Sequence, residues 1–466
     1  MMNEYIFFVV VSVFLLFNIS LAFIRNRKEK NTFIKFIADP NKHGTIIIAL
    51  SISGTIIGGG MFMTIGQIGY ESISAGIILG LVYLAGLFLV GITSRKIRDK
   101  MDNENHSTLI DFLKSYYNEK TVILFSIINI LMYLFLLAGQ FVVIFQLLLF
   151  TNGFMVNKWI PVVLILLSFI SILLIPVIGG LRKDIQTDIL QMGVIFVASI
   201  IICCKFFQTN NLLSVVQNIG DIETDNYGWP FIVGSVLFIT PSFFIRMDIW
   251  QRIRSAKSNK SSYRGFIIAG IISLFFFGVF TIMGIWAKSS GIKESQFSTL
   301  ELIFSIFKNP ITSGLIIGSF FAAVLSTADS LINATSIFIT RLSFTKKWTH
   351  KIDDNVSSEL LRKSRFVGLI TFAVALILGY IIPNIVDLMV GAISLLLIFL
   401  PAILGLFIEW WRNIKATYYA SIIGLLVFVL LFILWSPKTA FIPAVIITFL
   451  SYFIIRLLNV KYKNIF

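Results

Sequence analysis

Apolar segments of about twenty residues, separated by short polar connections, occupy most of this chain of 466 residues. A helix needs about 20 predominantly apolar residues to cross the hydrocarbon core of a bilayer, and we count thirteen segments near that length. The pattern predicts an all-α polytopic membrane protein with thirteen transmembrane helices, near residues 4–24, 44–66, 72–94, 120–150, 158–178, 188–207, 229–249, 264–287, 311–340, 365–382, 386–408, 416–435 and 438–457.

The composition agrees with this interpretation and excludes an ordinary soluble domain. Hydrophobic residues make up 57% of the chain, charged residues 13%, and the mean hydropathy is +0.91. The first apolar segment, 4–24, is too long for the h-region of a signal peptide and lacks a small-residue cleavage site, so it is predicted to be a retained span. Cys203 and Cys204 are adjacent and apolar in context, and we expect them to face lipid or pack between helices.

The basic residues are distributed as expected for a membrane protein. The formal net charge is +15. With the N-terminus outside the cell, all but six of the 38 Lys and Arg residues fall on the cytoplasmic side. The six exceptions are Lys158, Lys205, Lys288, Lys293, Lys308 and Lys438. This bias indicates a multi-pass protein of the plasma membrane with a cytoplasmic C-terminus and no nucleic-acid partner. The basic segment 251–257 is interpreted as a positive-inside anchor, and the acidic segment 221–225 falls outside.

Residues 318–341 combine a length suited to the membrane with many hydroxyl and amide groups. Helical spacing places these groups on or beside one face, with one carboxylate among them: Ser326, Thr327, Asp329, Ser330 and Asn333. Hydrocarbon offers such groups no partners, and oxygen donors without a His or Cys cluster suit a hard cation better than zinc or iron. An ion site is the favoured hypothesis, and hydrogen bonding between helices is the alternative.

Two predicted spans carry helix-breaking residues near their centres. The second contains Gly54 and residues 58–60, and four glycines at this depth favour an unwound or closely packed helix. The seventh contains Pro241, which removes a donor and frees the carbonyl of Leu237. Lying five apart, the two spans cross in opposite directions, as in an inverted repeat with its binding site between the broken helices. Two unrelated packing features are the alternative.

Three motifs resemble those of the sodium:solute symporters, a family with the leucine-transporter fold. The first is AAVLSTADS at 322–330, continuing to Thr340-Arg341; the second is GGLRKDIQTDILQ at 179–191. The third is Gln251-Arg252 followed by SAK at 255–257. Together with the helix count, the resemblance covers essentially the whole chain.

The resemblance implies a division of the chain into four parts. Residues 1–43 would form an extra N-terminal transmembrane helix and a cytoplasmic linker. Residues 44–207 and 208–408 would form two inverted repeats of five helices each. Residues 409–466 would supply two extra C-terminal transmembrane helices.

The resemblance also implies a sodium site built from two hydroxyls and three backbone carbonyls. The expected ligands are the side chains of Ser326 and Thr327 and the carbonyls of Ala323, Gly54 and Ile57. Asp188 would lie on the path by which the ion leaves towards the cytoplasm, although capping of the sixth helix is an alternative role for it. Sodium is the only cofactor that this pattern implies.

Residues expected to line a central solute cavity are Gln140, Thr240, Phe244 and Met61. A buried amide such as Gln140 needs partners, and bonding to a neighbouring helix is an alternative to contacting solute. Where some sugar-transporting relatives carry a gating tyrosine, this chain has Asp248. That difference disfavours a sugar and fits an amino acid or another small polar metabolite.

The leading hypothesis is a secondary active transporter that couples sodium to symport of a small organic solute by alternating access. A proton-coupled carrier is one alternative, with Asp188, Asp248 or Asp329 titrating. The hydroxyl pair 326–327 favours sodium, because hydroxyls do not carry protons reversibly near neutral pH. A transporter-like solute sensor is another alternative. Such sensors carry appended signalling domains, and this sequence ends at Phe466, just after its last predicted span.

An enzyme is not expected. The sequence has no GxxxxGK[ST] phosphate loop, and its three histidines, His43, His106 and His350, all fall in predicted cytoplasmic connections. The expected partners are the solute, sodium and the lipid bilayer, and no obligate protein partner is indicated.

Overall fold

The regular elements in the described part of the chain are helices. The computed structural model describes residues 4–23, 33–103, 106, 108–209, 229–295, 297–344, 354–434 and 437–463. The elements are α1 (Glu4–Phe23), α2 (Phe33–Ile37), α3 (Thr45–Ile56), α4 (Gly59–Glu71), α5 (Ile73–Asn103), α6 (Leu109–Lys114), α7 (Glu119–Phe154), α8 (Trp159–Thr209), α10 (Trp229–Ser242), α11 (Met247–Ser255), α12 (Asn259–Ser289), α13 (Ser298–Ile306), α14 (Pro310–Phe344), α15 (Asp354–Ile381), α16 (Ile385–Ile398), α17 (Leu400–Phe407), the 3-10 helix η1 (Glu409–Trp411), α18 (Ile414–Leu434) and α19 (Pro437–Lys463). The acidic segment 221–225 and His350 lie outside the described residues.

The helices are those of a multi-pass membrane protein, although the predicted count of thirteen spans is not confirmed. Eight described helices are long and apolar enough to cross a membrane, and up to eleven spans result if each of three bent helix pairs is one span. The difference has two sources. The predicted spans 158–178 and 188–207 both lie in α8, and the last one, 438–457, corresponds to the shorter apolar stretch Ile442–Leu458.

Within α8, the two predicted spans meet at Gly180. This residue has φ 59° and ψ −159°, a left-handed conformation that glycine adopts without strain. A Cβ at Gly180 would lie 2.5 Å from the Phe36 ring and 2.6 Å from the Phe36 carbonyl oxygen. The glycine of the GGL motif therefore serves both the kink and the close packing of α2 against α8.

Both predicted broken helices are confirmed. α3 and α4 meet at an angle of 67°, with a break at Ile57 and Gly58. The second break separates Val233–Ser242 of α10 from α11, which are bent by 52°. A third bend, of 47°, separates α16 from α17 and was not predicted from the sequence.

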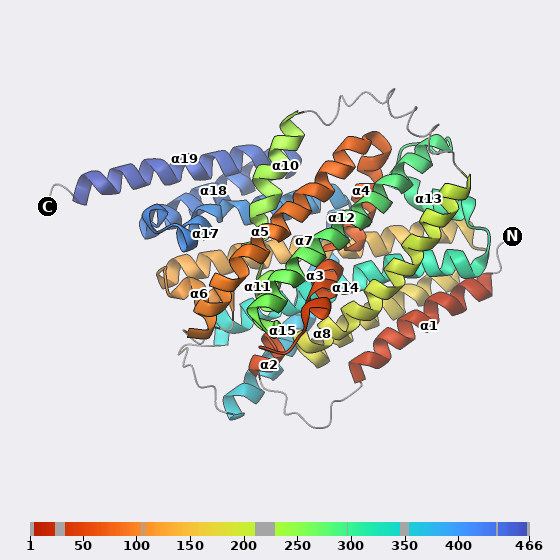
Figure 1. Cartoon of the computed structure of the whole chain (residues 1–466), viewed down its shortest axis with the longest axis horizontal. Coiled ribbons are helices and arrows are strands. Elements are labelled where there is room, and N and C mark those ends of the chain that lie inside the picture. Colours follow the sequence, from red (N-terminus) through yellow and green to blue (C-terminus); the bar gives the residue numbers. More distant parts are fainter. Residues whose placement is uncertain are drawn as a thin grey trace.

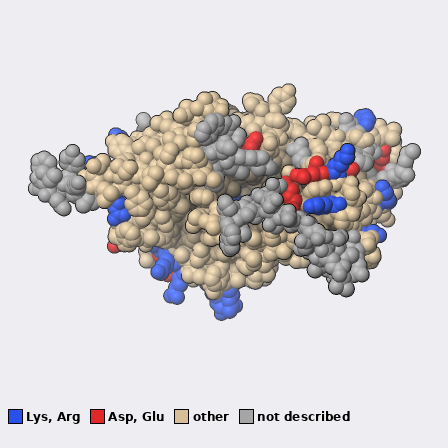
Figure 2. Space-filling model, turned by 90° about the horizontal axis from the view of Figure 1, so that it is seen from above, with Lys and Arg blue, Asp and Glu red and all other residues tan. Residues whose placement is uncertain are grey.

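α14 lies in the interior of the bundle (Figure 1), packed against α1, α3, α4, α7, α8 and α15. Of its most apolar window, 94% is buried, compared with 33% for α1. The polar face predicted on this segment therefore meets other helices, while apolar side chains such as Leu426 and Val13 remain exposed elsewhere. Most of the face shown in Figure 2 carries neither acidic nor basic side chains, as expected of a surface in contact with lipid.

Candidate ion site and its polar network

Ser326 of α14 lies against Asp188 of α8. The Ser326 hydroxyl donates a hydrogen bond to Asp188 Oδ1, and the Ser51 hydroxyl of α3 donates to Oδ2 of the same carboxylate at 2.6 Å. All three residues are buried. Because the Ser326 hydroxyl donates its hydrogen bond to a carboxylate, the lone pairs of its oxygen remain free to accept a cation. Asp188, predicted on the exit path, is therefore in direct contact with a predicted sodium ligand.

Thr327 faces the broken second span. Its Oγ1 lies 3.5 Å from the carbonyl oxygen of Gly54 and 3.3 Å from that of Thr55. Ile57, which ends α3 with the non-helical angles φ −84° and ψ 66°, is buried, as is Ala323. The structure thus brings Thr327 to Gly54. The assignment of the Ile57 and Ala323 carbonyls as ligands stays a prediction.

The glycines of the second span allow this close approach. A Cβ at Gly54 would lie 2.5 Å from Ser326 Oγ, and a Cβ at Gly58 would lie 2.6 Å from Thr327 Oγ1. A side chain at either position would displace a hydroxyl of α14. The two alternatives predicted from these glycines, an unwound helix and a closely packed helix, both occur here.

Arg252 of α11 occupies the centre of a buried polar network. Its Nη2 donates to Thr55 and Ser330 hydroxyls at 2.8 Å and lies 3.0 Å from Asp184 Oδ2 and 3.3 Å from Asp188 Oδ2. Its Nε donates to the Ser51 hydroxyl at 3.2 Å. We call Arg252 and these five side chains, Ser51, Thr55, Asp184, Asp188 and Ser330, the Arg252 network.

Sequence reasoning missed the Arg252 network. The interpretation of 251–257 as a positive-inside anchor is wrong for Arg252, whose side chain is fully buried. Gln251 is also buried and donates its amide to the Ile37 carbonyl at 2.6 Å. The available signal was the pair of acidic residues in the motif at 179–191, since a buried carboxylate requires a positive or hydrogen-bonding partner.

Asp248 is paired within its own segment and across to α7. Arg246 donates to both of its carboxylate oxygens, from Nε at 3.1 Å and from Nη2 at 2.7 Å. The hydroxyl of Tyr133 donates to Oδ1 at 2.7 Å. The carboxylate of Asp248 is therefore ion-paired with Arg246 inside the bundle.

Asp329 contrasts with these paired acids. It is fully buried, and among the described residues neither of its carboxylate oxygens accepts a hydrogen bond. Asn333, one turn later on α14, is also buried, and its amide has no hydrogen-bond partner there. The side chain of Gln191 from α8 lies close to Asp329 and donates to Asn18 of α1 at 3.2 Å.

The four predicted solute residues lie in pairs beside the two helix breaks. Gln140 Oε1 lies 3.5 Å from the amide nitrogen of Gly60, and Met61 follows in the first turn of α4. Thr240 stands near the end of α10, with its buried hydroxyl unpartnered among the described residues, and Phe244 lies in the break before α11.

Tyr83 of α5 connects the two breaks. Its hydroxyl donates to Met61 Sδ at 3.7 Å, and its ring packs edge-on against that of Phe243, with centroids 5.3 Å apart. Sequence reasoning did not single out this residue, which lies in an otherwise ordinary apolar span. Its contacts join Met61, after the first break, to Phe243 in the second break.

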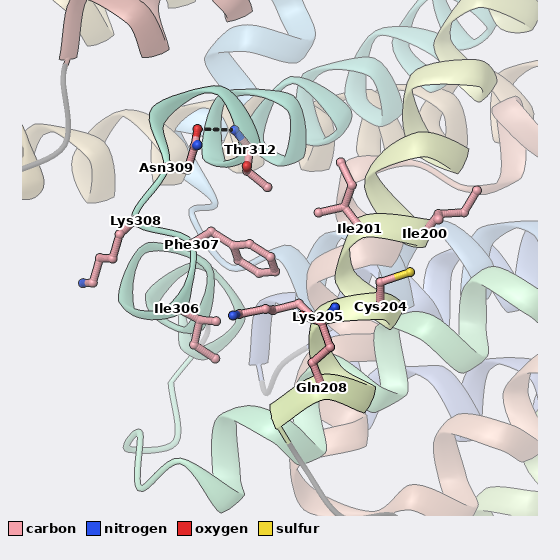
Figure 3. A pocket seen from close by; sticks show the side chains of 10 residues that line it. All are labelled: Ile200, Ile201, Cys204, Lys205, Gln208, Ile306, Phe307, Lys308, Asn309 and Thr312. Carbon is pink, nitrogen blue, oxygen red and sulfur yellow. Dashed lines mark hydrogen bonds between the residues drawn. The ribbon is translucent and has the colours of Figure 1, made fainter.

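A cavity of about 430 Å³ lies elsewhere, between the C-terminal end of α8 and the connection from α13 to α14. Figure 3 shows Lys205 and Phe307 facing it from these two elements. None of the residues predicted for the ion or the solute lines it. Lys308, at its edge, donates to the Phe304 carbonyl at 3.2 Å and so caps the end of α13. The cavity is therefore not part of the candidate site.

Comparison with known families decides the identity of the chain. The sequence profile of the sodium:solute symporter family matches residues 36–424. The chain belongs to the sodium:solute symporter family. It is a sodium-coupled secondary transporter and not an enzyme, and the resemblance seen in its motifs is confirmed. No curated protein gave a significant match.

Solved structures show the same fold. A Na⁺-coupled sialic acid symporter in a substrate-bound, outward-open state superposes with a TM-score of 0.76 at 18% identity, covering 97% of this chain and 96% of that one. Mhp1, a nucleobase-cation-symport-1 family transporter in a closed conformation with bromovinylhydantoin bound, superposes with a TM-score of 0.57 at 12% identity, covering 90% and 93%. This sodium:solute symporter therefore has the leucine-transporter fold.

Proposed function

We propose that this protein carries a small polar organic solute together with sodium, by alternating access. The observation that carries the proposal is the convergence of two α14 hydroxyls on the broken span α3–α4. Ser326 is hydrogen-bonded to Asp188, and Thr327 faces the carbonyls of Gly54 and Thr55. A hard monovalent cation prefers oxygen ligands of this kind.

The proposed sodium ligands are two hydroxyls and three carbonyls. They are the side chains of Ser326 and Thr327 and the backbone oxygens of Ala323, Gly54 and Ile57. The non-helical angles of Ile57 support this assignment, because its carbonyl is released from the regular pattern of α3. Such a cage is neutral, and the nearby carboxylate of Asp188 supplies the favourable charge.

A sodium ion in this position would connect the broken helix α3–α4 to α14. An ion that binds one arrangement of these helices better than another shifts the population towards that arrangement. One elementary charge moving down 100 mV yields roughly 2.3 kcal/mol. The sodium gradient can therefore drive accumulation of the solute.

The proposed framework is a pair of inverted repeats, at 44–207 and 208–408. It is supported by the two bent helix pairs, α3–α4 and α10–α11, which open the two repeats. Residues 1–43 and 409–466 would then be additions outside the repeats.

The proposed solute is an amino acid or a similar polar metabolite. The candidate contacts are Gln140, Met61, Thr240 and Phe244, which supply amide, thioether, hydroxyl and aromatic groups beside the breaks. Asp248 is already neutralised by Arg246, so this acid is not available to a cationic solute. The unpartnered Thr240 hydroxyl favours a solute with a hydrogen-bonding group.

The experiment that tests this function is a stability screen of the purified protein against polar metabolites, each in sodium and in potassium at equal ionic strength. A ligand that binds only the folded protein raises its melting temperature by mass action. We expect one class of solute to raise it in sodium and not in potassium. A solute that stabilises equally in both salts would contradict sodium coupling.

Asp329 favours one second candidate, in which a proton is a coupled ion. A buried carboxylate without a hydrogen bond is expected to be neutralised by a proton or a cation. In sodium-free liposomes, an inward proton gradient would then drive uptake, and Asp329→Asn would abolish that uptake. Lack of proton-driven uptake in the wild-type protein would exclude this candidate.

A further inference from the structure

The Arg252 network contains one more acidic than basic side chain. Asp184 and Asp188 contribute two carboxylates, and Arg252 contributes one guanidinium, all fully buried. Asp248, whose carbonyl oxygen lies 3.4 Å from Arg252 Nη1, has its carboxylate paired with Arg246. Buried charges are costly unless they are compensated. With both carboxylates ionised, the network carries one net negative charge, which a single monovalent cation would compensate.

Asp188 would be shared between two cations, the guanidinium of Arg252 and a sodium ion bound at Ser326. Its Oδ2 faces Arg252, and its Oδ1 accepts the hydroxyl proton of Ser326. An ion bound at Ser326 and the guanidinium of Arg252 would thus lie on opposite sides of one carboxylate. Both draw on the same negative charge, and like charges this close disfavour each other.

Arg252 also joins elements that belong to different parts of the bundle. It extends from α11 to Ser51 and Thr55 on α3, to both acids on α8 and to Ser330 on α14. These contacts lie in the half of the molecule that the charge distribution predicts to face the cytoplasm. α3 cannot move away from α8 and α14 without breaking these contacts of Arg252.

We propose that Arg252 is a tethered cation that competes with sodium for Asp188 and holds the cytoplasmic half of the broken helix closed. This inference rests on the proposed sodium site. It assigns Arg252 as a positioning residue that acts on sodium through Asp188. Coupling between two binding events is reciprocal. If Arg252 weakens sodium binding, sodium in turn weakens the contact between Arg252 and Asp188.

Removing the positive charge of Arg252 should strengthen sodium binding, which the loss of a merely structural contact would not do. Arg252→Gln removes the positive charge and keeps hydrogen-bonding capacity, so the network becomes doubly negative without sodium. We expect the sodium concentration for half-maximal thermal stabilisation of the purified variant to fall by a factor on the order of ten. Asp188→Asn should change this concentration in the opposite direction. A value for folded Arg252→Gln that is unchanged or higher than wild type overturns the proposal.

Two further variants complete the test. Arg254→Gln, which removes an arginine two residues away that pairs with Asp102, should leave the sodium response unchanged. Arg252→Gln combined with Asp184→Asn restores a single net negative charge, and its sodium midpoint should return close to that of the wild type. If Arg252→Gln alone does not fold, the double variant decides, because a midpoint well above wild type contradicts the charge balance.

The opening of the cytoplasmic half is tested by labelling. In sodium-free buffer, and with Cys203 and Cys204 replaced by serine, a cysteine introduced at Ser51, whose hydroxyl faces Asp188 of α8, should react with a membrane-impermeant thiol reagent faster in the Arg252→Gln background than in the Arg252→Lys background. Equal rates overturn the role of Arg252 in holding α3. If wild-type protein shows no sodium-specific stabilisation at all, the proposed sodium site itself fails. If sodium stabilises the wild-type protein and Ser326→Ala abolishes that stabilisation, the sodium site stands and the Arg252 variants test the role of Arg252 separately.

Discussion

At the scale of single residues, the site depends on which acceptor each hydroxyl donates its hydrogen bond to. A hydroxyl oxygen can bind a cation well only when its hydrogen is directed to another acceptor. Ser326 has such an acceptor in Asp188 Oδ1, and Thr327 has the carbonyls of Gly54 and Thr55 within 3.5 Å. Ser319 on the same helix donates to the carbonyl of Ile316 in its own helix at 2.6 Å, rather than to the broken span or to α8.

Replacing both hydroxyl residues, by Ser326→Ala with Thr327→Ala, should raise the sodium concentration needed for half-maximal uptake at least about tenfold. Loss of partners in a buried polar site costs about 1–3 kcal/mol, which corresponds to that range. Ser319→Ala removes a buried hydroxyl from the same helix and is the matched control. Sodium dependence unchanged from wild type in the double variant, at normal expression, would contradict the ion-site assignment.

At the scale of elements, the break between α3 and α4 and the surface of α14 fit each other through glycines. Gly54 and Gly58 allow backbone of the broken span to approach the two hydroxyl residues, where a Cβ would come within 2.5 Å and 2.6 Å of their oxygens. Glycine destabilises a helix by roughly 1 kcal/mol relative to alanine. Its presence here is explained by close packing rather than by helix stability.

Gly54→Ala should therefore weaken the response to sodium, because the added methyl group displaces Ser326 from Asp188. Thermal stabilisation by sodium, measured on the purified variant, should require several-fold more ion. Gly318→Ala is the control, since a Cβ at Gly318 meets nothing within 4 Å. Equal sodium midpoints for both variants would show that the approach of α3 to α14 does not govern the site.

At the scale of the whole molecule, the distribution of charged residues predicts the orientation in the membrane. The polar network lies inside the bundle around α14, and many exposed side chains of the spans are large and apolar. The basic connections cluster on one predicted side. This bias predicts that the half containing Arg252 and the kink at Gly180 faces the cytoplasm.

Epitope tags at the two ends test the orientation. A tag at Met1 should be accessible to antibody on intact cells, and a tag at Phe466 only after permeabilisation. The same side for both tags would require an even number of spans. The reverse pattern would place the Arg252 network in the half that faces outward.

Much of the fold and part of the site could be predicted from sequence because they depend on local properties. The apolar segments, the broken second and seventh spans and the polar face of α14 each follow from the residues within one segment. Segment length and glycine or proline content act locally, so these predictions did not need to know which helices are neighbours.

Only the tertiary structure decided which side chains meet. Arg252 looked like a surface anchor because its segment is basic, yet it is buried against Asp184 and Asp188 from a helix about sixty residues earlier. The role of Tyr83 was likewise not visible in the sequence, whereas the bend between α16 and α17 has a local signal in Pro401 at the start of α17. Such contacts depend on how helices distant in the chain pack, because the partner that neutralises a buried charge lies outside its own segment.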